Sequence, residues 1–305
     1  MNTRGYFLFF LGIMFVSCSP ENESTVKVIS TELPNGSIQF KWNDTNIETS
    51  AIEAIRFENG LNARVTGYTI QTTQSADVNS TRFLSIYAEN NTGSTVYNLG
   101  NVLYSNGGYG YITFLPNVQQ NGVYYSSINN TNLSDQSVHG MLNLTAVDTQ
   151  KREISGTFQS DVFYTNTTTS TVIDQKNISN GRFDQLHYKF RNNTNAMTAQ
   201  INGSAFTADY TLTSLQNSTI TIENRSYQLK TSLFIEIPAS ISIGSVAFSA
   251  TSSVKAYLKN EGIIIPLTAG SLQIDSLTGT NVSGTLNGTT SNGLRIENVV
   301  FNLKY

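Results

Sequence analysis

The segment GMLNLTAVDTQKREISGTF occupies residues 140–158, and a shorter version of it, GSLQIDSLTGTNVSGTL, occupies residues 270–286. Both versions begin with a glycine, continue through alternating apolar residues and a polar turn, and end in Ser-Gly-Thr followed by an apolar residue. Alternation of apolar and polar residues is typical of a half-buried β-strand. The doubled segment therefore predicts a protein built from two β-domains in tandem.

A second similarity precedes each copy of this segment. Residues 40–49 and 196–208 both alternate around a short polar turn, which in the later copy is Asn202-Gly203. Asn-Gly between two alternating segments is a strong signal for a β-hairpin. We therefore expect each β-domain to begin with a hairpin.

A third similarity follows each copy. Residues 178–188 and 296–305 share an isoleucine, a phenylalanine and a final Leu-x-Tyr in the same order. Three similarities in one order make a duplication the simplest explanation. We expect a first β-domain at residues 37–191 and a second, divergent copy at residues 192–305, each of ordinary domain size.

The remaining sequence consists of many short strand patterns separated by Asn, Gly and Pro turn signals. Such spacing predicts an all-β fold with two tandem antiparallel β-sandwich or open-barrel domains, and the pattern does not choose between sandwich and barrel. Two local expectations go with this fold. Residues 51–59 favour a short helix, although a strand at residues 54–58 fits nearly as well, and residues 117–137 are expected to form a long loop.

The N-terminus has the features of a secretory signal peptide. Arg4 supplies a positive charge, and residues 6–16 are apolar. This apolar run is shorter than the roughly 20 residues that a membrane-spanning helix needs. It therefore predicts a signal peptide at residues 1–17.

The end of this signal peptide resembles a bacterial lipobox. Phe15-Val16-Ser17 leads to Cys18, although the lipobox consensus prefers leucine where Phe15 stands. Cys18 is also the only cysteine of the chain. We interpret Cys18 as the lipidated N-terminus of the mature protein, which anchors it to a membrane. No disulfide can then form within one chain, so stability must come from burial of apolar side chains.

Residues 18–36 form the expected tether between the lipid and the first β-domain. The acidic stretch at residues 19–24 resembles the surface-export signal of Bacteroidetes-type outer-membrane lipoproteins. A solvated linker has the same composition, so both interpretations stay open. The expected location is the cell envelope, as an outer-membrane lipoprotein that the export signal would place at the cell surface.

Composition argues against a nucleic-acid partner. Charged residues make up 13% of the chain, the formal net charge is −3, and Lys and Arg form no block. Proteins that bind DNA or RNA carry clustered positive charge. Asn, Thr, Ser and Tyr supply the polarity instead, which suits an extracellular β protein.

The hairpin, the Gly-x-Leu-x-Leu strand and the Ile-Ser-Gly-Thr-Phe ending together resemble a domain family of unknown function that occurs in lipoproteins of Bacteroidetes-type bacteria. Residues 178–183 resemble the closing strand of that family, with Ser179 where threonine is usual. The resemblance covers most of residues 37–188 and recurs with losses at residues 196–305. It implies a secreted β-domain behind a lipobox, and it implies no activity.

Candidates for catalysis are few. The two histidines, His139 and His187, stand at the edges of predicted strands, and no Gly-x-Ser-x-Gly elbow accompanies them. No spacing of His, Cys or carboxylate residues matches a zinc or calcium site. We therefore expect no enzymatic activity, no metal and no cofactor. Ser155 invites interpretation as a nucleophile, but its counterpart Ser283 lies in a unit without histidine, so both are expected to be scaffold.

A group of tyrosines interleaved with Asn and Gly has the character of a binding surface. Aromatic faces beside polar groups suit sugar rings, because they offer apolar contact and hydrogen bonds together. Tyrosine is also a good strand former, so an ordinary sheet surface explains the same residues. The candidate ligand-binding residues are Tyr104, Tyr109, Tyr111, Tyr124 and Tyr125.

Three functions are compatible with this sequence. The leading hypothesis is a non-enzymatic lipoprotein whose β-domains bind a glycan or another envelope protein. The second is a structural spacer or envelope component. The third is a hydrolase with paired carboxylates, which can meet in an all-β domain without leaving a sequence signature.

Overall fold

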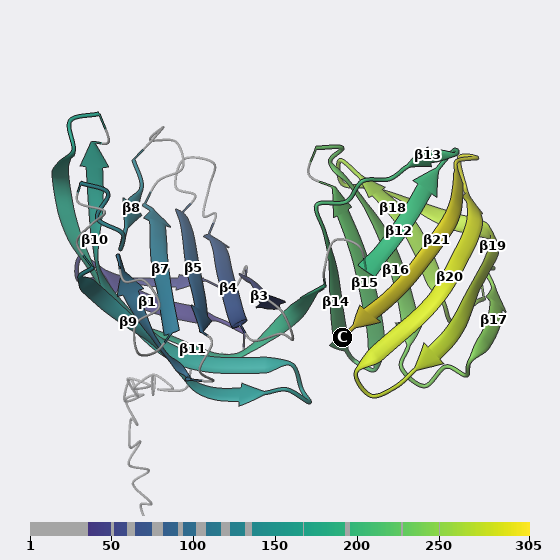
Figure 1. Cartoon of the computed structure of the whole chain (residues 1–305), viewed down its shortest axis with the longest axis horizontal. Coiled ribbons are helices and arrows are strands. Elements are labelled where there is room, and N and C mark those ends of the chain that lie inside the picture. Colours follow the sequence, from purple (N-terminus) through teal and green to yellow (C-terminus); the bar gives the residue numbers. More distant parts are fainter. Residues whose placement is uncertain are drawn as a thin grey trace, which may run out of the picture. The chain divides into compact units, whose positions relative to one another are not determined.

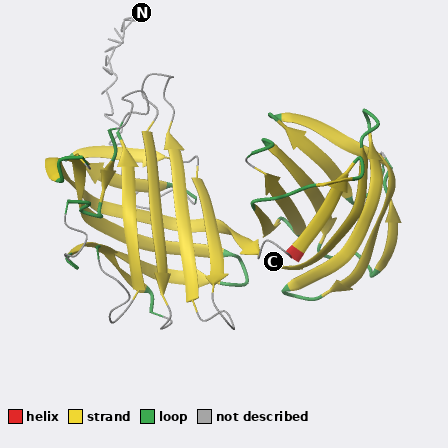
Figure 2. Ribbon diagram, turned by 45° about the horizontal axis from the view of Figure 1, so that its top comes forward, coloured by secondary structure: helices red, strands yellow, loops and turns green. Residues whose placement is uncertain are grey.

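The computed structural model describes residues 36–49, 52–59, 65–74, 82–90, 94–101, 108–116, 123–131, 136–166, 168–192, 196–226, 228–249 and 251–305. The protein is all-β, because these residues lie in strands and the turns between them, with no α-helix. Figure 2 shows the strands in yellow, and Ala196 alone among the described residues has a 3₁₀ conformation. None of them belongs to a helix that is long and apolar enough to cross a membrane. The predicted signal peptide, Cys18 and nearly all of the predicted tether lie outside the described residues.

The N-terminal half is defined here as strands β1–β11. The strands are β1 (Ile38–Trp42), β2 (Thr45–Thr49), β3 (Ile52–Asn59), β4 (Val65–Gln74), β5 (Arg82–Asn90), β6 (Val96–Gly100), β7 (Gly108–Leu115), β8 (Tyr125–Ser126), β9 (Val138–Asp148), β10 (Glu153–Asn166) and β11 (Thr171–Asn192). β3, β4, β5 and β7 form one layer, and β9, β10 and β11 cross it as a second layer (Figure 1). β6 pairs with both β7 and β9, and the end of β11 pairs with β3, so the two layers are joined by hydrogen-bonded ladders.

The C-terminal half comprises strands β12–β21. They are β12 (Met197–Ile201), β13 (Ser204–Ala205), β14 (Tyr210–Gln216), β15 (Thr219–Ser226), β16 (Thr231–Pro238), β17 (Gly244–Ala247), β18 (Lys255–Asn260), β19 (Ile263–Leu277), β20 (Asn281–Thr290) and β21 (Arg295–Lys304). β14, β15, β16 and β18 form one layer, and β19, β20 and β21 form the other. β19 belongs to both, because its beginning pairs with β18 and its remainder pairs with β20.

The two halves repeat one order of strand pairing. The layer β3–β4–β5–β7 corresponds to β14–β15–β16–β18, and the layer β9–β10–β11 corresponds to β19–β20–β21. The hairpin β1–β2 lies along β11 as β12–β13 lies along β21, and β6 and β17 pair with β9 and β19. The sequence similarities therefore coincide with equivalent places in the strand order.

The register of the ladders repeats as well. Gly156 of β10 faces Phe183 of β11, and Gly284 of β20 faces Phe301 of β21. No side chain fits at either glycine, because a Cβ atom would lie 2.7 Å from the ring of Phe183 or 2.9 Å from that of Phe301. The duplicated Ser-Gly-Thr segment thus holds a phenylalanine ring over a glycine in both halves.

Ser155, which precedes the first of these glycines, has a structural role. Its hydroxyl donates a hydrogen bond to Asp184 at 2.7 Å and accepts one from the backbone N–H of Gln185 at 3.0 Å. Gln185 has a positive φ of 46°, which marks a bulge in β11. The Ser155 hydroxyl therefore links β10 to the bulge in β11.

Buried apolar side chains form two clusters, one within each half. Both clusters arise because buried and more exposed side chains alternate along the strands. In β10, for example, Ile154 and Phe158 are buried while Thr157 is exposed. The division into two tandem domains stays a prediction, and residues 193–195 at the expected boundary lie outside the described residues.

Three local expectations need correction. Residues 52–59 form strand β3 and no helix, because β4 and β11 pair with it and satisfy its backbone groups, which overrides a weak helical preference. The sheet is mixed and not wholly antiparallel, since β3 runs parallel to β11 and β6 runs parallel to β7. The expected loop at residues 117–137 contains the short strand β8.

Candidate functional site

An aromatic cluster lies on the outer face of β3, β5 and β7. Tyr87 stands at its centre, with its ring centroid 5.1 Å from that of Tyr111 and 5.6 Å from that of Phe57, both nearly parallel. The ring of Tyr109 lies 6.2 Å from that of Tyr87, edge to face. We call Phe57, Tyr87, Tyr109 and Tyr111 the aromatic platform. Aromatic pairs in these geometries contribute about 0.5–1.5 kcal/mol each beyond simple burial.

Strand alternation places the platform on the outer face. Along β7, Gly110 and Ile112 are buried while Tyr109 and Tyr111 are half-buried. Successive side chains of a strand point to opposite faces, so a core residue at every second position leaves the tyrosines outside. Tyr87 faces Tyr111 directly across the β5–β7 ladder, which brings their rings together.

A carboxylate lies at the edge of the platform. The Tyr87 hydroxyl donates a hydrogen bond of 2.6 Å to Glu89, whose side chain is buried and which faces Tyr109 in the ladder. Burial raises the pKa of Tyr109 and of Tyr111, and the negative charge of Glu89 raises both further. The phenols therefore keep their protons and can donate hydrogen bonds, while the carboxylate can accept them.

The Phe57 end of the platform is fixed by its neighbours. Gly67 faces Phe57 in the β3–β4 ladder, and a Cβ atom there would lie 2.2 Å from the Phe57 ring, so only glycine leaves room. The guanidinium carbon of Arg191 lies 4.6 Å from the centroid of the same ring, a cation–π contact. Phe57 itself is buried, with 1% of its surface exposed, so it supports the Tyr87 ring and is not open to a ligand. The platform is built on paired strands and is organised before any ligand arrives.

The structure brings together two of the five tyrosines named from the sequence, Tyr109 and Tyr111. Tyr124 is exposed over 42% of its surface and precedes β8. Tyr104 lies outside the described residues.

Tyr125 belongs to a different environment. It is buried, its ring packs edge to face on Trp42 at 4.8 Å, and its hydroxyl donates to Asp174 at 2.7 Å. Burial raises its pKa to about 12, and the hydrogen bond and negative charge of Asp174 contribute. Tyr125 thus closes one end of the N-terminal core and is not part of the platform.

The sequence interpretation missed Phe57, Tyr87 and Glu89. The alternation of β5, in which Ile86 and Ala88 are buried, carries enough signal to place Tyr87 on the outer face. Its neighbours were not predictable, because β5 pairs with β7 although β6 lies between them in the chain.

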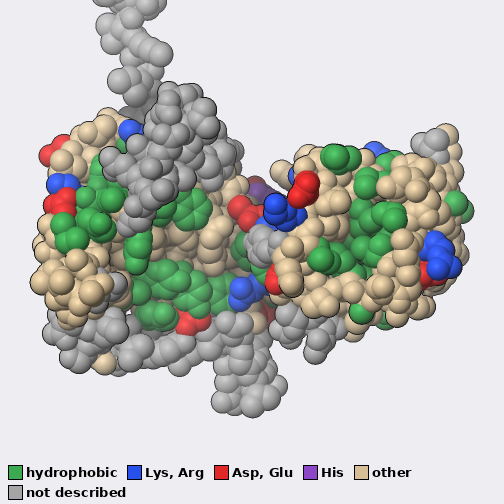
Figure 3. Space-filling model, turned by 90° about the horizontal axis from the view of Figure 1, so that it is seen from above, with side chains coloured by type: hydrophobic (Ala, Val, Ile, Leu, Met, Phe, Trp, Pro, Cys, Tyr) green, Lys and Arg blue, Asp and Glu red, His purple; other side chains and the backbone are tan. Residues whose placement is uncertain are grey.

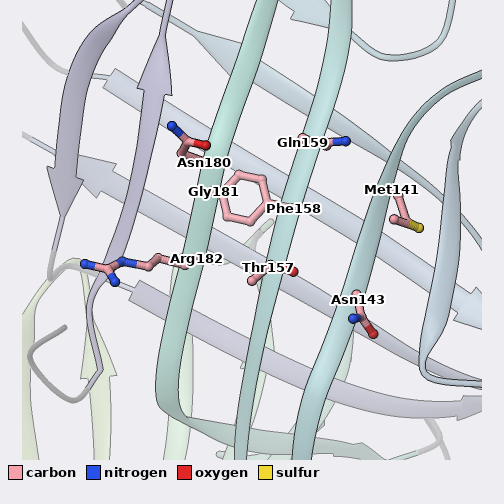
Figure 4. Close-up of a pocket in the computed structure, with 8 residues that line it drawn as sticks. All are labelled: Met141, Asn143, Thr157, Phe158, Gln159, Asn180, Gly181 and Arg182. Carbon is pink, nitrogen blue, oxygen red and sulfur yellow. The ribbon is translucent and has the colours of Figure 1, made fainter. Parts of the chain in front are cut away.

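A polar hollow of about 410 Å³ lies on β9, β10 and β11 (Figure 4). Five of its eight lining residues carry an amide, a hydroxyl or a guanidinium group. The residues are Met141, Asn143, Thr157, Phe158, Gln159, Asn180, Gly181 and Arg182. Arg182 donates to the side-chain oxygen of Gln39 at 3.0 Å, so a neighbouring strand already engages its charge.

This hollow follows from a bulge that both halves share. Asn180 has a φ of 51°, and Asn298, at the equivalent place in β21, has the same value. A hollow of about 330 Å³ lies beside Asn298 and includes Asn287 and Arg295. Because the bulge shapes the surface in both halves, we assign these hollows to the scaffold.

The histidines lie in packed positions. The ring of His139 lies 4.8 Å from that of Phe163, edge to face. Burial lowers the pKa of His187, and the opposing effect of Glu153 does not cancel it. Among the described residues, no three His, Cys, Asp or Glu side chains gather as a metal site requires.

Two carboxylates do approach a common pair of cations. Lys189 lies 3.0 Å from Glu53 and 3.4 Å from Glu223, and Arg225 lies 3.1 Å and 2.7 Å from the same two groups. Burial raises the pKa of Glu53, but hydrogen bonds and charge from Arg225 and Lys189 lower it more, so the net pKa lies below its usual value. A glycosidase acid needs a raised pKa. This arrangement therefore suits an ion-pair network.

Comparison with models of protein families, with curated proteins and with solved structures finds no match to this chain. The family resemblance drawn from the sequence motifs therefore stays a prediction.

Proposed function

We propose that this chain is a lipid-anchored protein of the cell envelope that binds a glycan on the aromatic platform and performs no chemistry on it. One observation carries the proposal. The half-buried rings of Tyr87 and Tyr111 stack on the outer sheet face, Phe57 packs buried against the other side of Tyr87, and the Tyr87 hydroxyl donates a hydrogen bond to Glu89.

The chemistry of a pyranose ring matches this surface. Such a ring has a face of C–H groups and a rim of hydroxyls. The half-buried rings of Tyr87, Tyr109 and Tyr111 offer apolar area to the face. The Tyr111 hydroxyl offers a donor to the rim, and the Tyr87 oxygen, whose proton goes to Glu89, can accept a hydrogen bond from it. Because tyrosine has few rotatable bonds, binding costs little side-chain entropy.

The surface composition agrees with an uncharged ligand. Charged residues are 13% of the chain, and the face shown in Figure 3 carries patches of hydrophobic side chains, with small groups of both positive and negative side chains beside them. A polyanion would need clustered Lys and Arg to neutralise it. Neutral polysaccharides are therefore the ligand class that we favour.

The anchor and the repeat complete the proposal. Lipidation of Cys18 would hold the protein at the envelope, with residues 18–36 as the tether. We also propose that the halves are tandem copies of one domain, which their shared strand pairing supports.

Affinity electrophoresis in gels that contain β-glucan, mannan or chitin derivatives tests the proposal. We expect at least one polysaccharide to retard the wild-type protein. Tyr111→Ala should weaken binding about tenfold, because loss of one central aromatic contact costs about 1–2 kcal/mol.

Tyr111→Phe is the matched control. It keeps the ring and removes only the hydroxyl, so we expect it to retain most of the binding. Retardation that is equal for wild type and Tyr111→Ala would refute a role for the platform. A wild-type protein that no polysaccharide retards would refute glycan binding and favour the spacer function.

A further inference from the structure

The C-terminal half contains a second stacked aromatic pair with a glutamate beside it. The ring centroids of Phe234 in β16 and Tyr257 in β18 lie 4.9 Å apart, with 12° between the planes. The Tyr257 hydroxyl donates to Glu236 at 2.9 Å. All three side chains are half-buried and alternate with core residues such as Ile235.

This arrangement occupies the same ladder positions as the platform. Tyr87 faces Tyr111 across β5–β7, and Phe234 faces Tyr257 across β16–β18. The glutamate stands two residues after the first ring of each pair, as Glu89 follows Tyr87.

The donor to the glutamate differs between the halves. Tyr87 itself donates to Glu89, but Phe234 has no hydroxyl. In the C-terminal half the partner ring, Tyr257, donates to Glu236 instead. A stacked pair with a phenol–carboxylate hydrogen bond is thus preserved although the residue that supplies the phenol has changed.

A cavity of about 710 Å³ adjoins Tyr257 and Glu236. This volume is within the ~300–1,000 Å³ that is typical of ligand pockets. Pro266 faces Tyr257 in the β18–β19 ladder and lines the cavity with exposed apolar surface. Lys255 faces Glu236 and stands at the place that Tyr109 has in the N-terminal half.

Polar groups surround the apolar surface of Tyr257 and Pro266 in this cavity. Besides Glu236 and Lys255, the hydroxyls of Ser249, Ser252 and Thr268 line the cavity. Glu236 accepts a hydrogen bond from Tyr257, and Ser252 accepts one from the backbone N–H of Val254. Carboxylate and hydroxyl oxygens can each accept more than one hydrogen bond, so these groups can also bind the hydroxyls of a ligand. A ring with one C–H face and a hydroxyl rim satisfies both parts of the surface.

We propose that this cavity is a second glycan-binding site, so that each chain carries two sites for pyranose rings. The inference rests on the proposed function for the ligand class. The location of the second site is argued independently, from the Phe234–Tyr257 pair, Glu236 and the adjoining cavity. The apolar face of the sugar would lie against Tyr257 and Pro266, with its hydroxyls toward Glu236 and Lys255.

Isothermal titration of the full chain with cellohexaose, mannohexaose and N-acetylchitohexaose tests this inference. At least one of them should bind wild type at two molecules per chain. Tyr87→Ala and Tyr257→Ala should each reduce the stoichiometry to one, and the double variant should bind none. Tyr257→Phe keeps the ring and should retain both sites. Glu236→Gln serves as a second probe of the cavity if Tyr257→Ala does not fold, and it should weaken the second site about tenfold.

The outcomes separate the two proposals. One molecule per wild-type chain, lost in Tyr87→Ala and kept in Tyr257→Ala, would overturn the second site and leave the platform standing. One molecule that is lost only in Tyr257→Ala would support the cavity and overturn the platform. If none of the three sugars binds wild type, both proposals are overturned.

Discussion

Replacing Gly284 with alanine tests the packing that both halves share. A Cβ atom at this position would lie 2.1 Å from the carbonyl oxygen of Gln273 and 2.9 Å from the ring of Phe301. The closest carbon–oxygen approach between sheet strands is about 3.3 Å. β19 and β20 would therefore have to separate by about 1 Å. The carbonyl belongs to the backbone, so a change of side-chain rotamer does not relieve the contact.

The expected cost follows from these contacts. Extra methyl groups in well-packed cores destabilise proteins by about 1–3 kcal/mol, occasionally more. The stiffer unfolded chain of the alanine variant offsets about 0.4–1 kcal/mol of this cost. We place Gly284→Ala at about 2 kcal/mol of lost unfolding free energy. Urea denaturation followed by far-ultraviolet circular dichroism measures this loss.

The matched control is Gly279→Ala. Gly279 is exposed, and a Cβ atom there would meet nothing within 4 Å. The unfolding free energy of the Gly279→Ala variant should stay within about 0.5 kcal/mol of the wild-type value. If the Gly284→Ala variant is as stable as the Gly279→Ala variant, the close packing of Gly284 against the Gln273 carbonyl is contradicted.

Three other outcomes are expected. Tyr125→Phe should lose about 1 kcal/mol with its hydrogen bond to Asp174. Because the folded pKa of Tyr125 is raised to about 12, wild type should lose stability as the pH rises from about 10, and the variant should not show this loss in alkaline urea titrations. The folded pKa of His187 is lowered, so wild type should lose stability as the pH falls below about 6.5, whereas His187→Asn should be flatter in acid melts; equal slopes would contradict the shift. Cys18→Ser should move the protein from the membrane fraction to the soluble fraction, and unchanged fractionation would contradict lipidation.

Local patterns in the sequence predict much of this fold. The Asn202-Gly203 turn has positive φ at both residues and joins β12 to β13, as the hairpin signal indicates. Alternation along β7 separates Ile112 and Phe114 from Tyr109 and its outer-face neighbours. Each of these features depends on residues that are adjacent or two apart, so a single segment contains the information.

Features that depend on distant strands were not predictable. Residues 51–59 left a helix and a strand nearly equal, because the pairing of β3 with β4 and β11 is not visible within its own residues. The platform has the same origin, since Tyr87 meets Tyr111 only because β5 and β7 are neighbours. Tyr125 was assigned to the candidate site by proximity in sequence, although its partner Trp42 lies on β1.

Saturation-transfer NMR tests most directly whether the aromatic platform binds a sugar face. The oligosaccharide that binds wild type most tightly is mixed with the protein, and the aromatic protons are irradiated. We predict strong transfer of saturation to the C–H protons on one face of a pyranose ring. Most of that transfer should be lost in the triple variant Tyr87→Ala, Tyr111→Ala, Tyr257→Ala, in which the third substitution removes binding at the second site. Transfer of wild-type strength in this variant, with its fold intact, would contradict the account.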